Sequence, residues 1–247
     1  MVKDEAKLRN KLRKISDALS KLFEIKRREK SDPLDILIAT ILSQNTNDLN
    51  SHKAFKNLKD KFPDFESLAN ADLREIERAI KVGGLARQKA KRIKNLLIEL
   101  KKKHGGFDLS FLKDLSVEDG IKFLTSFKGV GLKTVGCVLL FGFDKEVFPV
   151  DTHIHRILNR VGIVKTKTPE ETFFAVGKLI PDKLSYHLHT GLIKFGRAIC
   201  KARDPLCGVC PIYKICEFEM KSFYKKKTKD VEVNKNSALE FILLDEV

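Results

Sequence analysis

The sequence predicts an all-α protein, and three observations carry that prediction. About ten segments repeat apolar residues three and four positions apart, which is the period of an amphipathic helix. Residues that start or stop helices stand between these segments. Before residue 221, no stretch has the strict apolar–polar alternation of a half-buried strand.

Each expected helix has its own pattern or boundary residues. Leu8, Leu12, Ile15 and Leu19 form one face of the first helix. The second has Asp32 near its N-cap and a proline in its first turn, and Asn70 is a plausible N-cap further along. We expect helices over residues 7–25, 32–44, 51–62, 70–82, 86–104, 116–127, 131–143, 151–163, 168–180 and 184–200.

Composition limits the class of protein. The chain has 247 residues, of which 43% are hydrophobic and 33% charged, as in a globular protein with a sizeable core. No apolar run approaches the roughly 18 to 20 residues of a membrane helix, and the first residues lack the apolar region of a signal peptide. We therefore expect an intracellular, soluble protein and no membrane partner.

The charge balance points to a polyanion. Lysine and arginine total 48 against 33 acids, which gives a net charge of +15. Such a balance favours DNA or RNA as a partner. The alternative is a lysine-rich surface adapted to a hot or salty habitat, but such chains usually carry matching glutamate, and this one has too few acids.

Four of the five cysteines are crowded together. Cys200, Cys207, Cys210 and Cys216 have the spacing C-x6-C-x2-C-x5-C, which in an intracellular chain suggests a metal before a disulfide. A zinc site usually has two C-x2-C pairs, and here there is one. The spacing therefore favours a [4Fe–4S] cluster over zinc, with disulfides third. Cys137, in an apolar segment, is expected to be buried and structural.

Two short basic or glycine-rich stretches suggest contacts with DNA phosphates. In "FKGVGLKTVG", residues 127–136, Gly129 and Gly131 predict a tight turn whose free N–H groups face an anion at the start of the next helix. Such a site binds a phosphodiester without reading sequence. Lys201 and Arg203, between the first two cysteines, either meet the DNA backbone or are merely exposed charges. The turn alone is also compatible with a simple corner between helices.

Three motifs together resemble the endonuclease III family of helix-hairpin-helix base-excision DNA glycosylases. They are "FKGVGLKTVG", "FPVDTHIHRILNRVG" and the cysteine spacing, in the order found in that family, and the resemblance covers roughly residues 30–220. It implies a [4Fe–4S] cluster on the four cysteines. It also implies Lys133 as nucleophile, Asp151 as essential carboxylate, and main-chain DNA contacts at 129–131, which include Val130.

The implied roles agree with the chemistry of base removal. Cleavage of an N-glycosidic bond builds positive charge on the sugar, which a carboxylate stabilises. A neutral lysine amine can attack C1′ and form a Schiff base that permits β-elimination of the 3′ phosphate. The alternatives are that Lys133 only touches phosphate and that Asp151 only caps the helix after it. His153 and His155 are expected to be structural or to contact DNA.

The resemblance also suggests which residues meet the damaged base pair, because a base inside a duplex must be flipped out and the gap filled. "LSQNTND" aligns Asn45 with the family's gap-filling glutamine, with Gln44 beside it as the other candidate. "GGLARQKA" points to Leu85 as the wedge. The basic stretch at 87–94 is expected to form a helical face that contacts phosphate or solvent.

The expected architecture is two-lobed. Residues 33–145 form a central domain with the hairpin, and residues 1–32 plus 146–220 form a domain with the cluster. DNA is expected between the lobes of a monomer, and residues 221–247 are a tail whose "LEFILL" is a strand, a helix or an interaction segment.

We expect a bifunctional DNA glycosylase and AP lyase that removes oxidised pyrimidines. The alternatives are a monofunctional mismatch glycosylase for uracil or thymine opposite guanine, and a non-enzymatic DNA-binding protein. Phe127-Lys128 stands where Leu-Pro is usual, and "CVLLFGF" with "FPVDTH" resembles archaeal branches and plant demethylating glycosylases.

Overall fold

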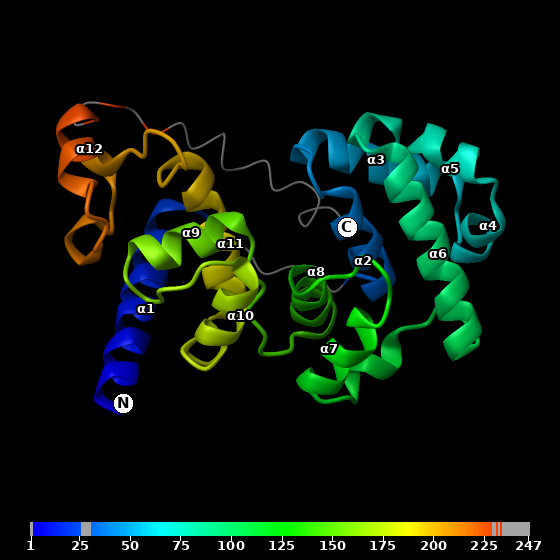
Figure 1. The fold of residues 1–247 in the computed structure, drawn as a ribbon, viewed down its shortest axis with the longest axis horizontal. Coiled ribbons are helices and arrows are strands. Elements are labelled where there is room, and N and C mark those ends of the chain that lie inside the picture. The colour runs from blue at the N-terminus through cyan, green and yellow to red at the C-terminus, as the bar shows by residue number, and fades with distance from the viewer. Residues whose placement is uncertain (1, 26–30, 229–230, 232, 234–247) are drawn as a thin grey trace. The chain divides into compact units, whose positions relative to one another are not determined.

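A computed structural model describes residues 2–25, 31–228, 231 and 233 of the chain. The described residues are helical with connecting turns and include no β-strand, which confirms the all-α prediction (Figure 1). They form two compact units: one joins the N-terminal helix to the chain from Glu146 onward, and the other ends at Lys145.

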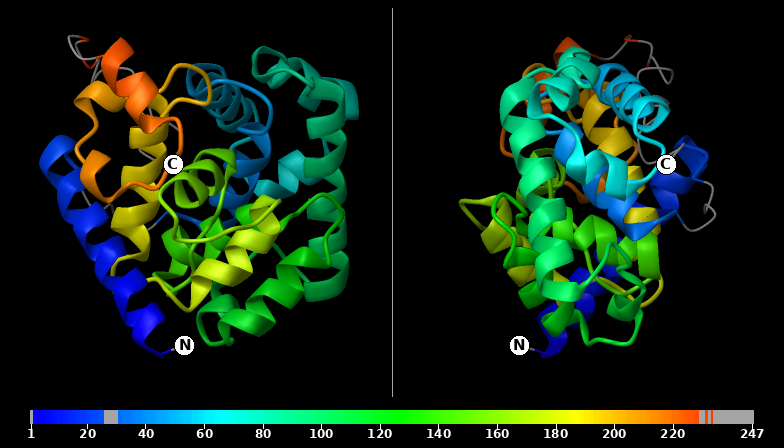
Figure 2. Two further views of the ribbon diagram at one scale, coloured as in Figure 1. Left: turned by 60° about the vertical axis from the view of Figure 1, so that its left-hand side comes forward. Right: turned by 90° about the vertical axis from the view of Figure 1, so that its right-hand side faces the viewer.

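The core of the first unit contains α1 (Val2–Leu22), α9 (Thr152–Arg160) and α11 (Ser185–Ala198). The apolar face expected on α1 is confirmed, since Leu12, Ile15 and Leu19 are fully buried. Helices α1 and α11 lie side by side, and α11 also packs on α9 (Figure 2). The other α-helices of this unit are α10 (Pro169–Gly177) and α12 (Lys221–Lys227).

The second unit is built around the almost wholly buried helix α2. Asp32 accepts hydrogen bonds from the N–H groups of Leu34 at 2.8 Å and Asp35 at 3.3 Å, with Pro33 in the first turn, as predicted. The α-helices of this unit are α2 (Pro33–Leu42), α3 (Asp48–Lys61), α4 (Phe65–Asn70), α5 (Leu73–Ala79), α6 (Ala86–His104), α7 (Val117–Thr125) and α8 (Leu132–Cys137).

Most expected helices differ from the structure by a few residues at their ends, and two differ in other ways. Asn70 does not cap a helix but ends α4, because Ala71 is extended and the carboxylate of Asp72 accepts from the Arg74 N–H at 2.7 Å to begin α5. The helix expected over 131–143 is α-helical only as far as Cys137 and continues as a wider π-helical turn, Val138–Gly142. The buried, structural reading of Cys137 is confirmed, since its side chain is fully buried.

The end of the chain is described only in part. Helix α12 occupies the start of the expected tail, and the segment "LEFILL" lies outside the described residues. No helix in the described part of the chain is both long and apolar enough to cross a membrane.

Candidate functional site

The glycine turn, residues 127–131, joins α7 to α8, and the buried ring of Phe127 packs into the core at its start. Phe127 is 2% exposed, and its ring centroid lies 5.3 Å from that of Phe123. Gly129 has a φ of 87°, a conformation that L side chains rarely adopt. Gly131 is the N-cap of α8 and brings no side chain to the helix start, so the first N–H groups of α8 need another acceptor. The side chain of Val130 is buried, so only its main chain can reach a ligand.

Lys133 is the second residue of α8 and is half-buried. Within the described residues its ammonium makes no hydrogen bond or ion pair. A lysine held at a helix start without a carboxylate partner is available to react or to bind an anion.

Asp151 begins α9, and the capping prediction is confirmed. One of its carboxylate oxygens accepts the N–H of Ile154 at 2.8 Å. Burial lowers the pKa of neighbouring His153, and the positive charges of Arg156 and Arg197 act in the same direction, whereas Asp151 opposes them. Lys133 belongs to the unit that ends at Lys145, and Asp151 belongs to the other unit.

Of the two roles expected for His155, structural support or DNA contact, its contacts within the protein show the first. Its Nδ1 lies 2.7 Å from the hydroxyl oxygen of Thr172, and the amide of Asn159 lies 3.3 Å from the same nitrogen. The imidazole therefore links α9 to α10.

The four clustered cysteines line one cavity. Val161, Phe195, Ile199 and Ile212 are among its apolar walls. In the described part of the chain, no three histidine, cysteine or acidic side chains are close enough to share one metal ion. Four cysteines with a single C-x2-C pair fit a cubane cluster better than zinc.

Burial keeps three of the four thiols in this cavity protonated. Burial raises the pKa of Cys207 to about 11 and that of Cys210 to about 12, and the neighbouring cysteines add to both shifts. Burial also raises the pKa of Cys216. Without a metal these thiols are neutral, so loading of the cluster releases protons.

Two arginines of α9 hold the first cysteine. Arg156 Nη2 donates to the Cys200 carbonyl at 2.8 Å, and Arg160 Nη1 lies 3.5 Å from the Cys200 Sγ. Arg160 also donates to the Lys201 carbonyl at 2.7 Å. No sequence pattern predicts these contacts, because they join residues about 40 positions apart. They leave the side chains of Lys201 and Arg203 exposed in the loop.

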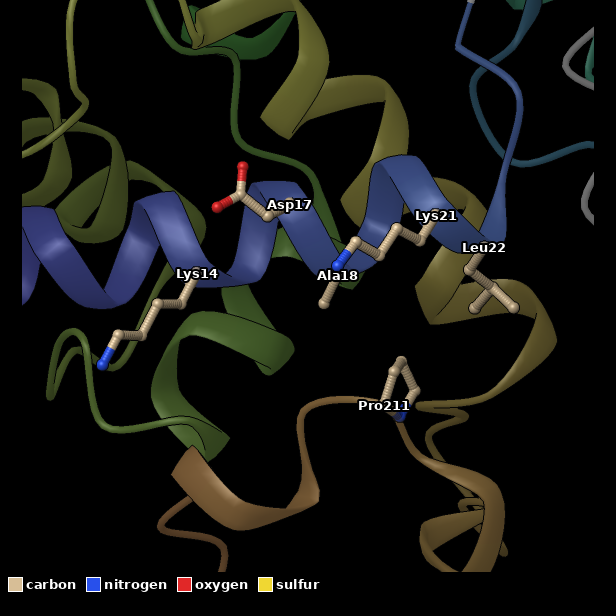
Figure 3. Close-up of a pocket in the computed structure, with 6 residues that line it drawn as sticks. All are labelled: Lys14, Asp17, Ala18, Lys21, Leu22 and Pro211. Carbon is tan, nitrogen blue, oxygen red and sulfur yellow. The ribbon is translucent and has the colours of Figure 1, made fainter.

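A shallow hollow lies between α1 and Pro211, which directly follows Cys210 (Figure 3). Ala18, Leu22 and Pro211 give it apolar walls, and the remaining lining residues are Lys14, Asp17 and Lys21. None of the predicted catalytic residues lines it.

The two loops expected to meet the lesion share an unusual backbone. Asn45 has a φ of 52° and Leu85 a φ of 49°, both in the left-handed region that non-glycine residues rarely occupy. Leu85 is 49% exposed, which excludes a buried core role. Asn45 is exposed, whereas Gln44 accepts a 2.7 Å hydrogen bond from Arg92 through its Oε1.

The basic face expected over 87–94 is wrong at one position. Lys89 is only 2% exposed, and it donates to the carbonyls of Leu42 at 2.7 Å and Gly83 at 2.8 Å. Burial lowers its pKa to about 8, and the nearby charge of Arg92 adds to this effect. A buried lysine in a run of basic residues has no distinguishing sequence pattern, so only the structure reveals it.

Comparisons with known proteins define the class. Residues 38–182 match the HhH-GPD superfamily of base excision DNA repair proteins, and residues 200–216 match the iron–sulfur binding domain of endonuclease III. The second match confirms the iron–sulfur cofactor expected on the four cysteines.

Relatives and a solved structure agree with that class. The chain is 42% identical to endonuclease III of Thermotoga maritima over 77% of this chain and 85% of the relative. It is 35% identical to endonuclease III of Sulfolobus acidocaldarius over 74% and 80%. It resembles the structure of a trapped endonuclease III–DNA covalent intermediate with a TM-score of 0.74 and 29% identity, over 87% of this chain and 98% of the other.

The chain therefore belongs to the endonuclease III family of HhH-GPD DNA glycosylases with an iron–sulfur domain. It is a DNA glycosylase and AP lyase of base excision repair. This excludes the non-enzymatic alternative. Similar proteins come from both a bacterium and an archaeon, so the expected archaeal-like branch is not established.

Proposed function

We propose that the protein removes oxidised pyrimidines from duplex DNA and cleaves the strand 3′ to the resulting abasic site. The observation that carries this proposal is the place of Lys133, in the first turn of the helix that follows the glycine turn. A phosphodiester bound by the turn would bring the sugar–phosphate backbone to the lysine amine.

In the proposed reaction, Lys133 gives a proton to solvent and its Nζ attacks C1′. The base leaves with the electron pair of the glycosidic bond and takes up a proton from water. Opening of the sugar ring gives an imine between Nζ and C1′. Loss of a proton from C2′ then expels the 3′ phosphate by β-elimination, and water releases the lysine. Asp151 stabilises the positive charge that develops on the sugar as the base departs.

Asn45 and Leu85 are proposed to enter the duplex when the damaged base leaves it. The exposed amide of Asn45 suits the gap better than that of Gln44, which Arg92 already holds. The half-exposed Leu85 supplies an apolar wedge. Lys201 and Arg203, with the main chain at 129–131, would bind phosphates.

The cluster supports DNA binding in this proposal and takes no part in the chemical steps. When bound, a [4Fe–4S] cluster supplies four iron–thiolate bonds that fix the loop between Cys200 and Cys216. We also propose that the protein acts as a monomer inside the cell, where its DNA substrate lies.

Borohydride trapping tests the lyase reaction. Purified protein is mixed with duplex DNA that contains thymine glycol or an abasic site, and borohydride reduces any imine to a stable protein–DNA adduct. We expect an adduct with the wild type and with Lys128→Gln, an exposed lysine of the same turn, and none with Lys133→Gln.

Two results would contradict the proposal. Base release with neither adduct nor strand cleavage would indicate a monofunctional glycosylase in which Lys133 binds phosphate. An adduct that persists in Lys133→Gln would assign the nucleophile to another amine.

A further inference from the structure

Lys89 is a buried cation that no step of the proposed reaction uses. It lies on α6, is 2% exposed and is among the largest fully buried side chains of the described residues. Burying an ammonium group is costly unless it is hydrogen-bonded, so its two carbonyl partners must offset that cost.

Both carbonyls lie at the base of a loop expected to meet the lesion. Leu42 is the last residue of α2, and Asn45 follows three residues later. Gly83 closes a short 3₁₀ turn, and Leu85 follows two residues later. The ammonium group of Lys89 therefore connects the starts of two loops. Its Nζ lies 2.7 Å from the Leu42 carbonyl oxygen and 2.8 Å from the Gly83 carbonyl oxygen.

A second residue of the same helix face extends this connection. Arg92, one turn after Lys89, holds the side chain of Gln44 at 2.7 Å. A Cβ built on Gly129 would lie only 3.2 Å from the Arg92 side chain, so this arginine also packs against the glycine turn. Helix α6 therefore contacts the two lesion loops and the hairpin within one unit.

The loops need such support because their key residues are strained. A left-handed asparagine or leucine persists only where the surrounding structure holds it. Asn45 and Leu85 both have this conformation, and each lies within three residues of a carbonyl bound by Lys89.

We propose that Lys89 is a positioning residue that holds the Asn45 loop and the Leu85 loop in register, so that amide and wedge enter the duplex together. This inference rests on the proposed function, since it assigns both loops to the opening of a damaged base pair. Lys89 itself is buried and touches no substrate.

The test compares single-turnover base release from thymine-glycol duplexes by four proteins: wild type, Lys89→Met, Leu85→Ala and the double variant. A 2-aminopurine opposite the lesion reports the opening of the base pair by its fluorescence. Methionine keeps the length of lysine and removes its donors. Lys102→Met, an exposed change on the same helix outside the basic stretch at 87–94, is the matched control.

We expect Lys89→Met to slow opening and base release about tenfold, because small displacements of positioning groups have large effects. Leu85→Ala should then add less than about twofold in the Lys89→Met background, since residues that act together are not additive. Multiplicative effects, or a Lys89→Met rate equal to that of Lys102→Met, would overturn the inference.

Hydrogen exchange separates positioning from general loss of structure. In Lys89→Gln, which can keep one of the two bonds, amides of both loops should exchange faster together while α1 stays protected. Faster exchange in only one loop, or no change in either, would overturn the inference even if Lys89→Met does not fold. Failure of the proposed function is a distinct result, in which the wild type releases no base and gives no borohydride adduct.

Discussion

At the scale of single residues, Asp151 performs one task that the structure shows and one that we propose. It caps α9 through one carboxylate oxygen, and its charge is proposed to stabilise the sugar cation. Asparagine is an equally good cap without the charge. The two roles can therefore be separated by a single substitution.

We expect Asp151→Asn to reduce base release at least about 100-fold, since electrostatic stabilisation of this kind is worth that much in enzymes. The melting temperature should change little. Asp151→Ala should lose activity too, with about 1 kcal/mol of stability from the missing cap. Base release and thermal unfolding of both variants give the comparison, and near-normal turnover by Asp151→Asn would confine the residue to capping.

The buried lysine predicts a pH dependence of stability. The pKa of Lys89 is lowered to about 8 from 10.5, so between these values the unfolded chain binds more protons here than the folded chain. Stability from this group therefore rises with pH, by up to about 1.4 kcal/mol per unit. We expect the free energy of unfolding of wild type relative to Lys89→Met to increase from about pH 8 to pH 10 in urea titrations. A constant difference would contradict the lowered pKa.

At the scale of elements, the glycine turn contains two glycines that serve different purposes. Gly129 has a φ of 87°, and an added Cβ would lie 3.2 Å from Arg92. Gly131 has a φ of −97°, and an added Cβ would meet no atom within 4 Å. The first glycine is needed by the fold of the turn, and the second leaves room for a ligand.

We expect Gly129→Ala to lower the free energy of unfolding by about 1–2 kcal/mol, because alanine is strained in the left-handed region. Gly131→Ala should unfold like the wild type but bind DNA more weakly, since the new methyl group stands where a phosphate would approach. Chemical unfolding and DNA titrations at fixed salt measure both effects. Equal free energies of unfolding for the two variants would contradict the inference that only Gly129 is needed for the fold of the turn.

A helix can be predicted accurately from the sequence where a single local pattern determines its ends. Residues 86–104 are helical as expected, because the apolar period runs up to a glycine with a φ of 78°. Helix α4, Phe65–Asn70, is not predicted, and the helix expected from Asn70 begins at Leu73, since Asn70 and Asp72 are both good caps and only the conformation of Ala71 decides between them. The π-helical turn after Cys137 has the same apolar pattern as an α-helix.

At the scale of the whole molecule, motifs in a fixed order were enough to predict the family and its cofactor, and both are confirmed. The contacts that support the site were not predictable. Arg160 meets the cysteine loop across 40 residues of sequence, and Lys89 reaches Leu42 across 47. Such contacts depend on packing between distant segments, which a local pattern does not encode.

The net charge of +15 supplies long-range attraction to DNA, but phosphate contacts are made by particular side chains. Lys201 and Arg203 are exposed in a loop whose backbone accepts a hydrogen bond from Arg160 at the Lys201 carbonyl. Lys14 and Lys21, beside the hollow between α1 and Pro211, are also exposed but belong to no proposed DNA surface (Figure 3). Lys201 with Arg203 and Lys14 with Lys21 carry the same total charge, and the two pairs differ in their position on the protein.

Removing Lys201 and Arg203 together should flatten the dependence of log affinity on log salt concentration by about 2, since each phosphate contact contributes about 0.9. Changing Lys14 and Lys21 to alanine should shift affinity slightly at low salt and leave the slope unchanged. Binding to undamaged duplex at several salt concentrations measures both slopes. Equal slopes for the two double variants would mean that net charge alone attracts the DNA, and that the cysteine loop does not bind the phosphate backbone.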